Sequence, residues 1–202
     1  MWHKWAFVMS VPLGIALVLA ATSTRERVAL AVYALSLMSL FGVSAVYHRV
    51  NWRTLGARRW MRRLDHSMIF MLIAGTYTPF AVIALHGTLA FAVLVAVWVL
   101  AAVGTSFNLI WISAPKWLLT IVYVSIGWAA AVALPELAEA VGVAGLALLA
   151  LSGVCYTAGA VIYVVRRPDP VPTVFGYHEL FHALVVVAAA CQYAVIAFWV
   201  AS

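Results

Sequence analysis

Charged residues are scarce in this chain of 202 residues, where Asp, Glu, Lys and Arg together make up only 9%. An ordinary soluble domain carries roughly 25% charged residues. Hydrophobic residues reach 67%, and the mean hydropathy is +1.08. A soluble fold of this length could not bury so much apolar side chain, because its surface would have to be built from aliphatic residues. The composition therefore indicates an integral membrane protein, and it excludes a disordered tail and a collagen-like fibre.

Cysteine is also rare, with two residues in the chain, Cys155 and Cys191. Two cysteines are too few for a disulfide framework, and each lies inside a long apolar run, so we expect small buried hydrophobes in membrane helices. The first apolar run, which ends near Ala20, has some features of a secretory signal. It is longer than a typical signal core, and we therefore expect it to be the first membrane span.

Seven segments are long and apolar enough to cross a bilayer, which takes about 20 residues of helix. Polar or proline-containing stretches separate them, including a basic connection between Arg49 and Arg63 and the sequence from Arg166 to Pro170. No repeat and no second domain is recognisable. The sequence predicts an all-α, single-domain bundle over residues 1–202, with seven transmembrane helices at 5–21, 28–48, 65–85, 88–107, 117–134, 141–165 and 177–200.

The distribution of Lys and Arg predicts the orientation of this bundle. With a cytoplasmic N-terminus and an external C-terminus, ten of the 12 basic residues lie inside, and only Arg25 and Arg27 lie outside. The positive-inside rule favours this arrangement. Topology then explains the formal net charge of +6 without a nucleic-acid partner. The ten inner residues are Lys4, Arg49, Arg53, Arg58, Arg59, Arg62, Arg63, Lys116, Arg166 and Arg167.

Ionisable residues near membrane spans are costly and mark candidate functional sites. Six of them occur where the second span ends and where the third and seventh spans begin, three positions on the same membrane face. The charge rule makes that face cytoplasmic, so three helices should bring polar groups to one leaflet. The six are His48, Asp65, His66, His178, Glu179 and His182.

His178 and His182 are four residues apart, which places both imidazoles on one face of a helix. One helix can offer two nitrogens to a single Zn²⁺ in this way. The motif alone is weak, but a third imidazole from His48 at the same depth strengthens it. Three neutral imidazoles suit Zn²⁺ and leave a fourth position for water, whose pKa the metal lowers towards about 7.

Asp65 and Ser44 each allow two interpretations. Asp65 could cap the third span, since Asp is favoured before the first helical turn. It could also hydrogen-bond a zinc-bound water and act as general base or acid. Ser44 lies one turn before His48 and could face the same cavity, although small hydroxyl residues in membrane helices more often bond a backbone carbonyl or pack against a neighbour.

Four further residues are expected outside the metal site. His66 and Glu179 lie about 100° around their helices from their neighbours Asp65 and His178 and should face another helix or lipid headgroups. His3 and His86 are expected at the membrane interface.

Several motifs in this order resemble the hemolysin III family, the bacterial branch of the progestin and adipoQ receptor superfamily, which includes the adiponectin receptors. They cover the chain from the second span to the seventh: Ser44-x-x-x-His48, Leu64-Asp65-His66, residues 73–79 (IAGTYTP) and residues 178–182 (HELFH). The resemblance implies seven helices with the N-terminus inside. It also implies a zinc ion held by His48, His178 and His182, with Asp65 contacting its water and Ser44 beside the site. Pro79 matches the family's Tyr-Thr-Pro and should kink the third helix.

The resemblance implies a function less directly than a fold. Adiponectin receptors and related membrane hydrolases suggest zinc-dependent hydrolysis of a lipid amide or ester, such as a ceramide, taken from the inner leaflet. A non-catalytic role in membrane homeostasis or sensing is the alternative, and the family name also suggests a pore. We expect a multi-pass protein of the bacterial inner membrane with Zn²⁺ as cofactor, lipids as partners and substrate, and no nucleic-acid partner. Asp65 and Ser44 are the expected catalytic residues.

Overall fold

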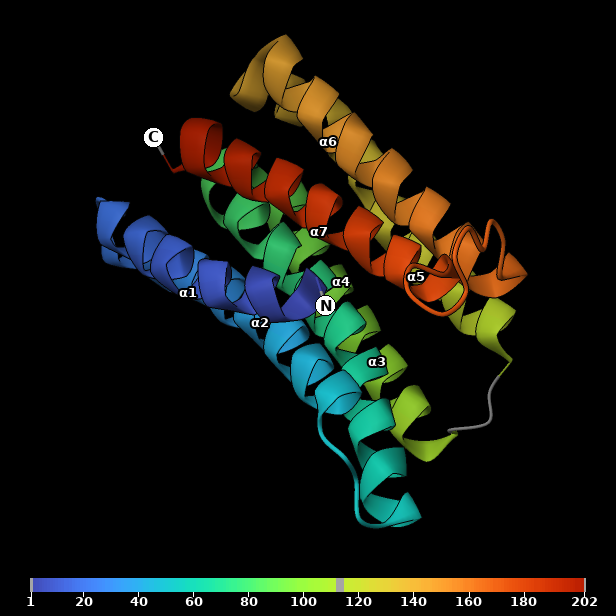
Figure 1. The fold of residues 1–202 in the computed structure, drawn as a ribbon. Coiled ribbons are helices and arrows are strands. Elements are labelled where there is room, and N and C mark those ends of the chain that lie inside the picture. The colour runs from blue at the N-terminus through green and yellow to red at the C-terminus, as the bar shows by residue number, and fades with distance from the viewer. Residues whose placement is uncertain (1, 112–114, 202) are drawn as a thin grey trace.

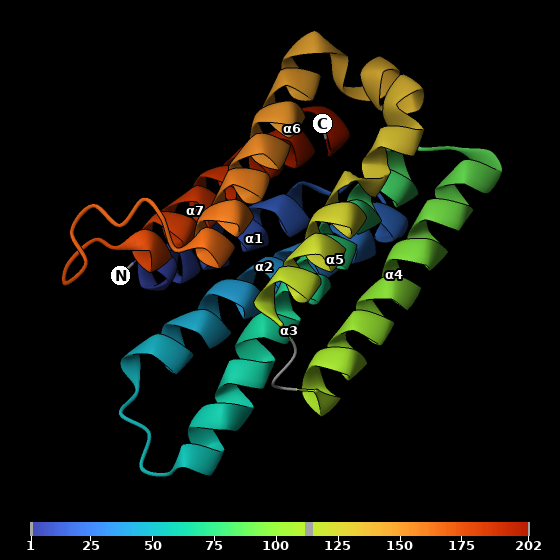
Figure 2. The ribbon, with the colours of Figure 1, turned by 90° about the vertical axis from the view of Figure 1, so that its right-hand side faces the viewer.

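The computed structural model describes residues 2–111 and 115–201, and in this part of the chain the protein is an all-α bundle without strands. Met1, residues 112–114 and Ser202 lie outside the described residues, so part of the fourth predicted connection is not covered. The helices lie side by side and run obliquely across the views in Figures 1 and 2. Their bounds are α1 Trp2–Ala20, α2 Thr24–Arg49, α3 Leu55–Pro79, α4 Gly87–Ile110, α5 Lys116–Trp128, α6 Leu134–Val165 and α7 Tyr177–Val195.

Three short segments continue these helices in other helical forms. Residues Phe80–Ala84 form a π-helix directly after Pro79, Ala129–Ala133 form a 3-10 helix, and Ile196–Val200 form a second π-helix. Proline has no N–H to donate and its ring crowds the preceding turn, so Pro79 weakens the helix on its N-terminal side. The helix changes from α- to π-helical geometry directly after Pro79, and the kink expected at this residue stays a prediction.

Six helical stretches in the described residues are long and apolar enough to cross a membrane. The fifth, Trp117–Val165, has 49 residues and contains both α5 and α6. A straight helix of that length would measure about 73 Å, far more than the roughly 30 Å of a hydrocarbon core. The stretch instead folds back on itself, since Trp128 Nε1 donates to Thr157 Oγ1 at 3.0 Å and Gly142 has a non-helical φ of 61°.

Helix ends are fixed by local hydrogen bonds that the sequence encodes. Ser23 and Glu26 form a capping box at the start of α2. Thr54 caps α3 by accepting from the Ala57 N–H at 3.2 Å, and Glu179 accepts from the Gly176 N–H at 3.2 Å to begin α7. The Glu179 carboxylate thus holds the backbone in the turn that carries His178.

The outer surface is apolar and the interior is closely packed with small residues. Leu19, Phe91 and Ile110 are each more than 70% exposed, as expected for side chains that face lipid rather than water. Inside, Gly75 of α3 lies so close to Ser36 of α2 that a Cβ atom would collide with that side chain. Small residues allow such close approach between membrane helices. Cys155 is buried, Cys191 is partly buried, and both are free thiols.

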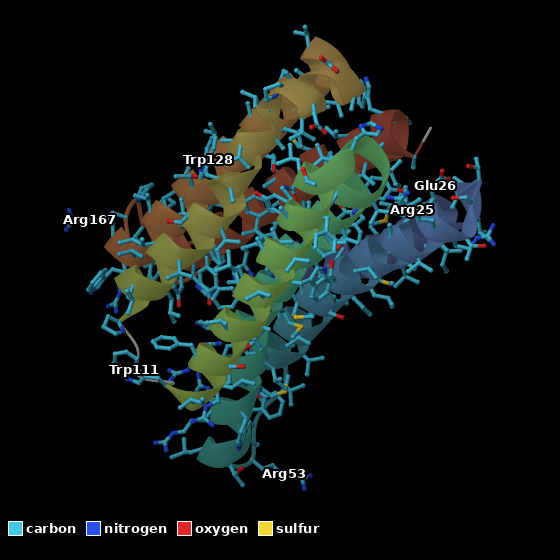
Figure 3. All side chains as sticks on the ribbon, turned by 180° about the vertical axis from the view of Figure 1, so that it is seen from behind. Arg25, Glu26, Arg53, Trp111, Trp128 and Arg167 are labelled. Atoms are coloured by element: carbon cyan, nitrogen blue, oxygen red, sulfur yellow. The ribbon has the colours of Figure 1, made fainter. Side chains whose placement is uncertain are left out.

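The bundle has two chemically different ends. Figure 3 shows Arg53, Trp111 and Arg167 at one end and Arg25 and Glu26 at the other. The N-terminus and the α2–α3 and α6–α7 connections lie at the first of these ends, and the C-terminus lies at the second (Figures 1 and 2). We call the first the basic end, because it carries most of the arginines.

Candidate metal centre

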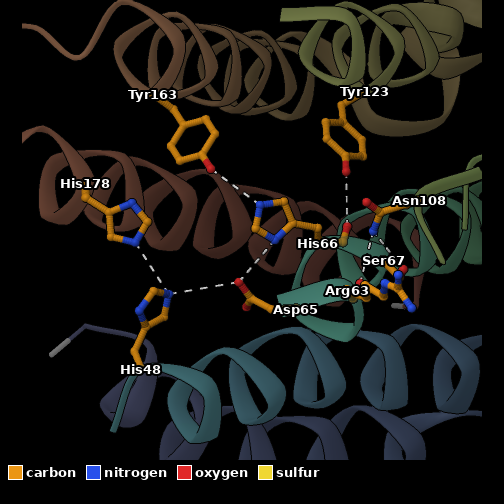
Figure 4. Close-up of polar contacts among 9 residues, drawn as sticks. All are labelled: His48, Arg63, Asp65, His66, Ser67, Asn108, Tyr123, Tyr163 and His178. Carbon is orange, nitrogen blue, oxygen red and sulfur yellow. Dashed lines mark hydrogen bonds and ion pairs between the residues drawn. The ribbon is translucent and has the colours of Figure 1, made fainter. Parts of the chain in front are cut away.

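Three histidines from two helices meet near the basic end. His48 lies in the last turn of α2, and His178 and His182 lie in the first two turns of α7. Each offers one ring nitrogen, and these three nitrogens lie within 4.8 Å of one another. The Nε2 atoms of His48 and His178 are 3.4 Å apart (Figure 4). The cluster is therefore close enough to hold a metal ion.

The three histidine side chains differ in how far they are exposed at the surface. His182 is buried at 8% exposure, His178 is half-buried, and the His48 side chain is 34% exposed. The cluster is thus enclosed on the α7 side and accessible on the α2 side. Such an arrangement leaves a route by which water or a substrate can approach the ligand nitrogens.

Asp65 lies beside the cluster, but the suggestion that it caps the third span is wrong. Thr54 is the N-cap and α3 begins at Leu55, ten residues earlier, so Asp65 belongs to the third helical turn. Its Oδ2 is 4.0 Å from His48 Nε2 and 3.6 Å from His66 Nδ1. At 4.0 Å the carboxylate is too far from His48 to share a direct hydrogen bond with it.

Ser44 is buried one helical turn before His48, at 2% exposure. Its side chain lies near the Asp65 carboxylate. The side chain therefore faces the site rather than lipid. Ser44, His48 and Asp65 together link the end of α2 to the interior of α3.

His66 faces another helix, as one of the two sequence interpretations expected. Its Nε2 lies 3.4 Å from the Tyr163 hydroxyl of α6, and the Tyr123 hydroxyl of α5 donates to its backbone carbonyl at 3.2 Å (Figure 4). A neighbouring polar network ties α4 to α3, where Asn108 Nδ2 donates to Ser67 Oγ and to the Arg63 carbonyl, both at 3.0 Å. These bonds fix the part of α3 that carries Asp65.

His3 is the residue that sequence reasoning placed wrongly. It was expected at the membrane interface, yet it is only 6% exposed and its ring stacks on His182 with centroids 3.9 Å apart. No motif signals this, because most of the chain separates His3 from His182. His86, expected at the interface as well, is exposed at the opposite end, where its backbone N–H donates to Glu136 Oε2 at 3.0 Å.

The arrangement has the parts of a metal-assisted acid–base site. Imidazole nitrogens are good ligands for divalent first-row metals. A carboxylate near the cluster can accept or return a proton, and a buried hydroxyl can donate a hydrogen bond. The ion pairs of the Asp65 carboxylate among the described residues are with His48 and His66.

Comparisons with known proteins show which family this chain resembles. A sequence model described as "Haemolysin-III related" matches residues 1–193. The chain is 30% identical to "Hemolysin-3 homolog" of Bacillus subtilis (strain 168) over 200 residues, covering 98% of this chain and 90% of the relative. It is 30% identical to "Hemolysin-3" of Bacillus cereus, covering 98% and 88%. It is also 27% identical to human "Monocyte to macrophage differentiation factor", covering 83% and 68%. The family resemblance inferred from the motifs is thereby confirmed.

Proposed function

This chain belongs to the haemolysin-III related family, and from that membership and the histidine cluster we propose that it is a zinc-dependent membrane hydrolase acting on a lipid amide or ester. The substrate is ceramide-like and comes from the inner leaflet of the bacterial inner membrane. The single observation that carries the proposal is the meeting of His48, His178 and His182, with Asp65 beside them. A pure membrane anchor has no need for four such groups at one point.

The donor set and its spacing suit zinc. Two nitrogens bound to one tetrahedral Zn²⁺ at about 2.0–2.1 Å are separated by about 3.3 Å. The Nε2 atoms of His48 and His178 lie 3.4 Å apart, which supports binding to the same ion. All three ligands are neutral imidazoles, and such three-histidine sites keep a fourth position open for chemistry.

His48, His178 and His182 would hold the Zn²⁺, which when bound would supply a Lewis acid that polarises a carbonyl and makes water acidic enough to ionise near neutral pH. Asp65 takes the proton of the attacking water and returns it to the leaving amine or alcohol. Its place in the third turn of α3, tied by the contacts of His66, Tyr123 and Tyr163, holds the carboxylate in position. Ser44 donates a hydrogen bond to the oxygen that gains negative charge.

The surroundings suit a lipid. A cavity of about 310 Å³ at the basic end is lined by Tyr47, Leu55, Arg58, Arg59 and Arg62. The Tyr47 ring packs against His48 with centroids 4.6 Å apart. The polar head of a lipid can occupy this cavity while its acyl chain stays in the bilayer, so the substrate enters sideways.

The test joins metal analysis with lipid mass spectrometry on purified protein. We expect one zinc per chain and cleavage of a lipid amide or ester that stops when a chelator removes the metal and resumes when zinc is restored. Zinc without any lipid turnover would favour the alternative function, a membrane-homeostasis sensor, because a site can bind metal without performing chemistry.

The proposal includes a single domain of seven crossings over residues 1–202, with α5 and α6 each crossing once and the basic end in the cytoplasm. The folding back of Trp117–Val165 and the concentration of arginine at one end support this topology.

We therefore expect reporter fusions at Trp60 and Arg167 to read cytoplasmic and a fusion after Ser202 to read external. Opposite readings at Trp60 and Arg167 would contradict the proposed topology, since the three ligands would then belong to different membrane faces.

A further inference from the structure

The ring of His3 packs against two other rings, those of His182 and Phe41, next to the candidate metal centre. Its ring is stacked on His182 of α7, with centroids 3.9 Å apart and an angle of 23° between the planes. The edge-on ring of Phe41 from α2 lies on it as well, with centroids 5.1 Å apart. A residue in the first turn of α1 is thus held between the two helices that supply the ligands.

His3 does not itself complete the cluster of ligands. The group of nitrogens close enough to share an ion comprises His48, His178 and His182. Both ring nitrogens of His3 are buried, and neither has a hydrogen-bond partner in the described part of the chain. His3 therefore contacts the other described residues through the faces and edges of its ring and not through hydrogen bonds, and the ring stacks on His182.

His182 depends on such ring contacts for its orientation. A metal-binding histidine is usually held by a hydrogen bond from its second nitrogen, which fixes the ring plane. Among the described residues, His182 makes no such bond. It is surrounded instead by His3, by His178 at 4.4 Å, by His48 at 5.1 Å and by Phe181 at 5.4 Å between centroids. Of these four rings, only His3 lies parallel to it.

We propose that His3 is a positioning residue that fixes the ring plane of His182 by stacking on it, so that the N-terminal turn of α1 forms one wall of the metal centre. The inference rests on the proposed metal site. A separation of 3.9 Å is van der Waals contact for stacked rings, so rotation of the His182 ring about its side-chain bond would drive its edge into His3. Phe41 of α2 packs against the same His3 ring.

The experiment compares zinc affinity among variants of the purified full-length protein, measured by competition with a chelating dye. His3→Ala removes the stacked ring and should weaken zinc binding by about 10–100-fold, the usual cost of losing a residue that orients a ligand. His3→Phe keeps a flat ring and should bind zinc close to wild type. It also removes two unpaired buried nitrogens, so its thermal stability should not fall. The matched control, His86→Ala, removes an imidazole at the opposite end and should leave zinc affinity unchanged.

The visible spectrum of bound Co²⁺ gives a second readout that reports ligand geometry directly. The spectrum should change in His3→Ala and persist in His3→Phe. If His3→Ala does not fold, His3→Leu replaces it, because leucine fills the space without offering a flat ring and should behave like alanine. Wild-type affinity and spectrum in the alanine or leucine variant would overturn the inference, as would a phenylalanine variant that binds as weakly as alanine. Failure of the wild-type protein to bind zinc would instead overturn the proposed metal site. The outcome for the metal site can therefore be told apart from the outcome for the role of His3.

Discussion

Asp65→Asn should keep its zinc and lose lipid hydrolysis by about 10²–10⁴-fold, the usual contribution of general acid–base catalysis. The amide has the size of the carboxylate but cannot accept a proton from water. Asp65 is not the cap of α3, so the substitution leaves the start of that helix untouched. It is also not one of the three histidine ligands, so metal binding should survive. Turnover is measured by lipid mass spectrometry and zinc by metal analysis on the same preparation.

The matched control for this variant is Glu139→Gln. It makes the same chemical change at an exposed carboxylate of α6, far along the chain from Asp65. We expect its turnover to equal that of wild type. An Asp65→Asn protein that hydrolyses lipid at the wild-type rate with its zinc intact would remove Asp65 from the mechanism. If that variant also replaced the wild-type protein in a deletion strain, the hydrolase proposal would give way to the sensor.

The double variant His178→Ala/His182→Ala should lose nearly all bound zinc. Both rings come from one helical face of α7, and His48 alone is a poor site for a tetrahedral ion. His178→Ala by itself should lose most of the metal, and because this ring is half-buried the substitution disturbs packing less than a change at buried His182. Metal content is measured after dialysis, with helicity checked by circular dichroism.

His66→Ala is the control, since it removes a nearby imidazole that contacts Asp65 and Tyr163 and is not one of the three clustered ligands. It should retain zinc. Stoichiometric zinc in the double variant would refute the assignment of the three histidines as ligands. Zinc loss in His66→Ala with full zinc in the double variant would move the site towards α3 and α6.

These variants also separate the remaining functions suggested by the family. A sensor without chemistry should tolerate Asp65→Asn as long as the zinc stays. A pore should be judged by ion flux in liposomes, which hydrolysis does not require. The buried histidine cluster by itself gives no reason to expect such flux.

The sequence alone determined the class of protein and the positions of most of its helices. Lipid-facing and buried residues are both apolar, so a membrane helix appears as an uninterrupted run that any hydropathy count detects. The helices at 2–20, 24–49, 87–110 and 177–195 overlap the expected spans at 5–21, 28–48, 88–107 and 177–200. The i, i+4 pair His178 and His182 was also readable, because helix geometry places both on one face.

Other features required the tertiary structure. The basic segment 55–64 looks like a loop because it is too polar for the bilayer, but it forms nearly three turns of α3 before Asp65. Polarity marks the edge of the hydrocarbon, not the end of a helix. For this reason the sequence pattern suggests that Asp65 caps the third span, whereas the N-cap of α3 is Thr54.

The role of His3 depended entirely on packing. In a soluble helix, the polar face shows which side is exposed, so the buried side can be inferred from the sequence. In this chain lipid replaces water, apolar residues surround most helices on all sides, and the pattern does not show which side faces the interior. Only the packing of α1 between α2 and α7 decided that His3 lies against His182 instead of at the interface.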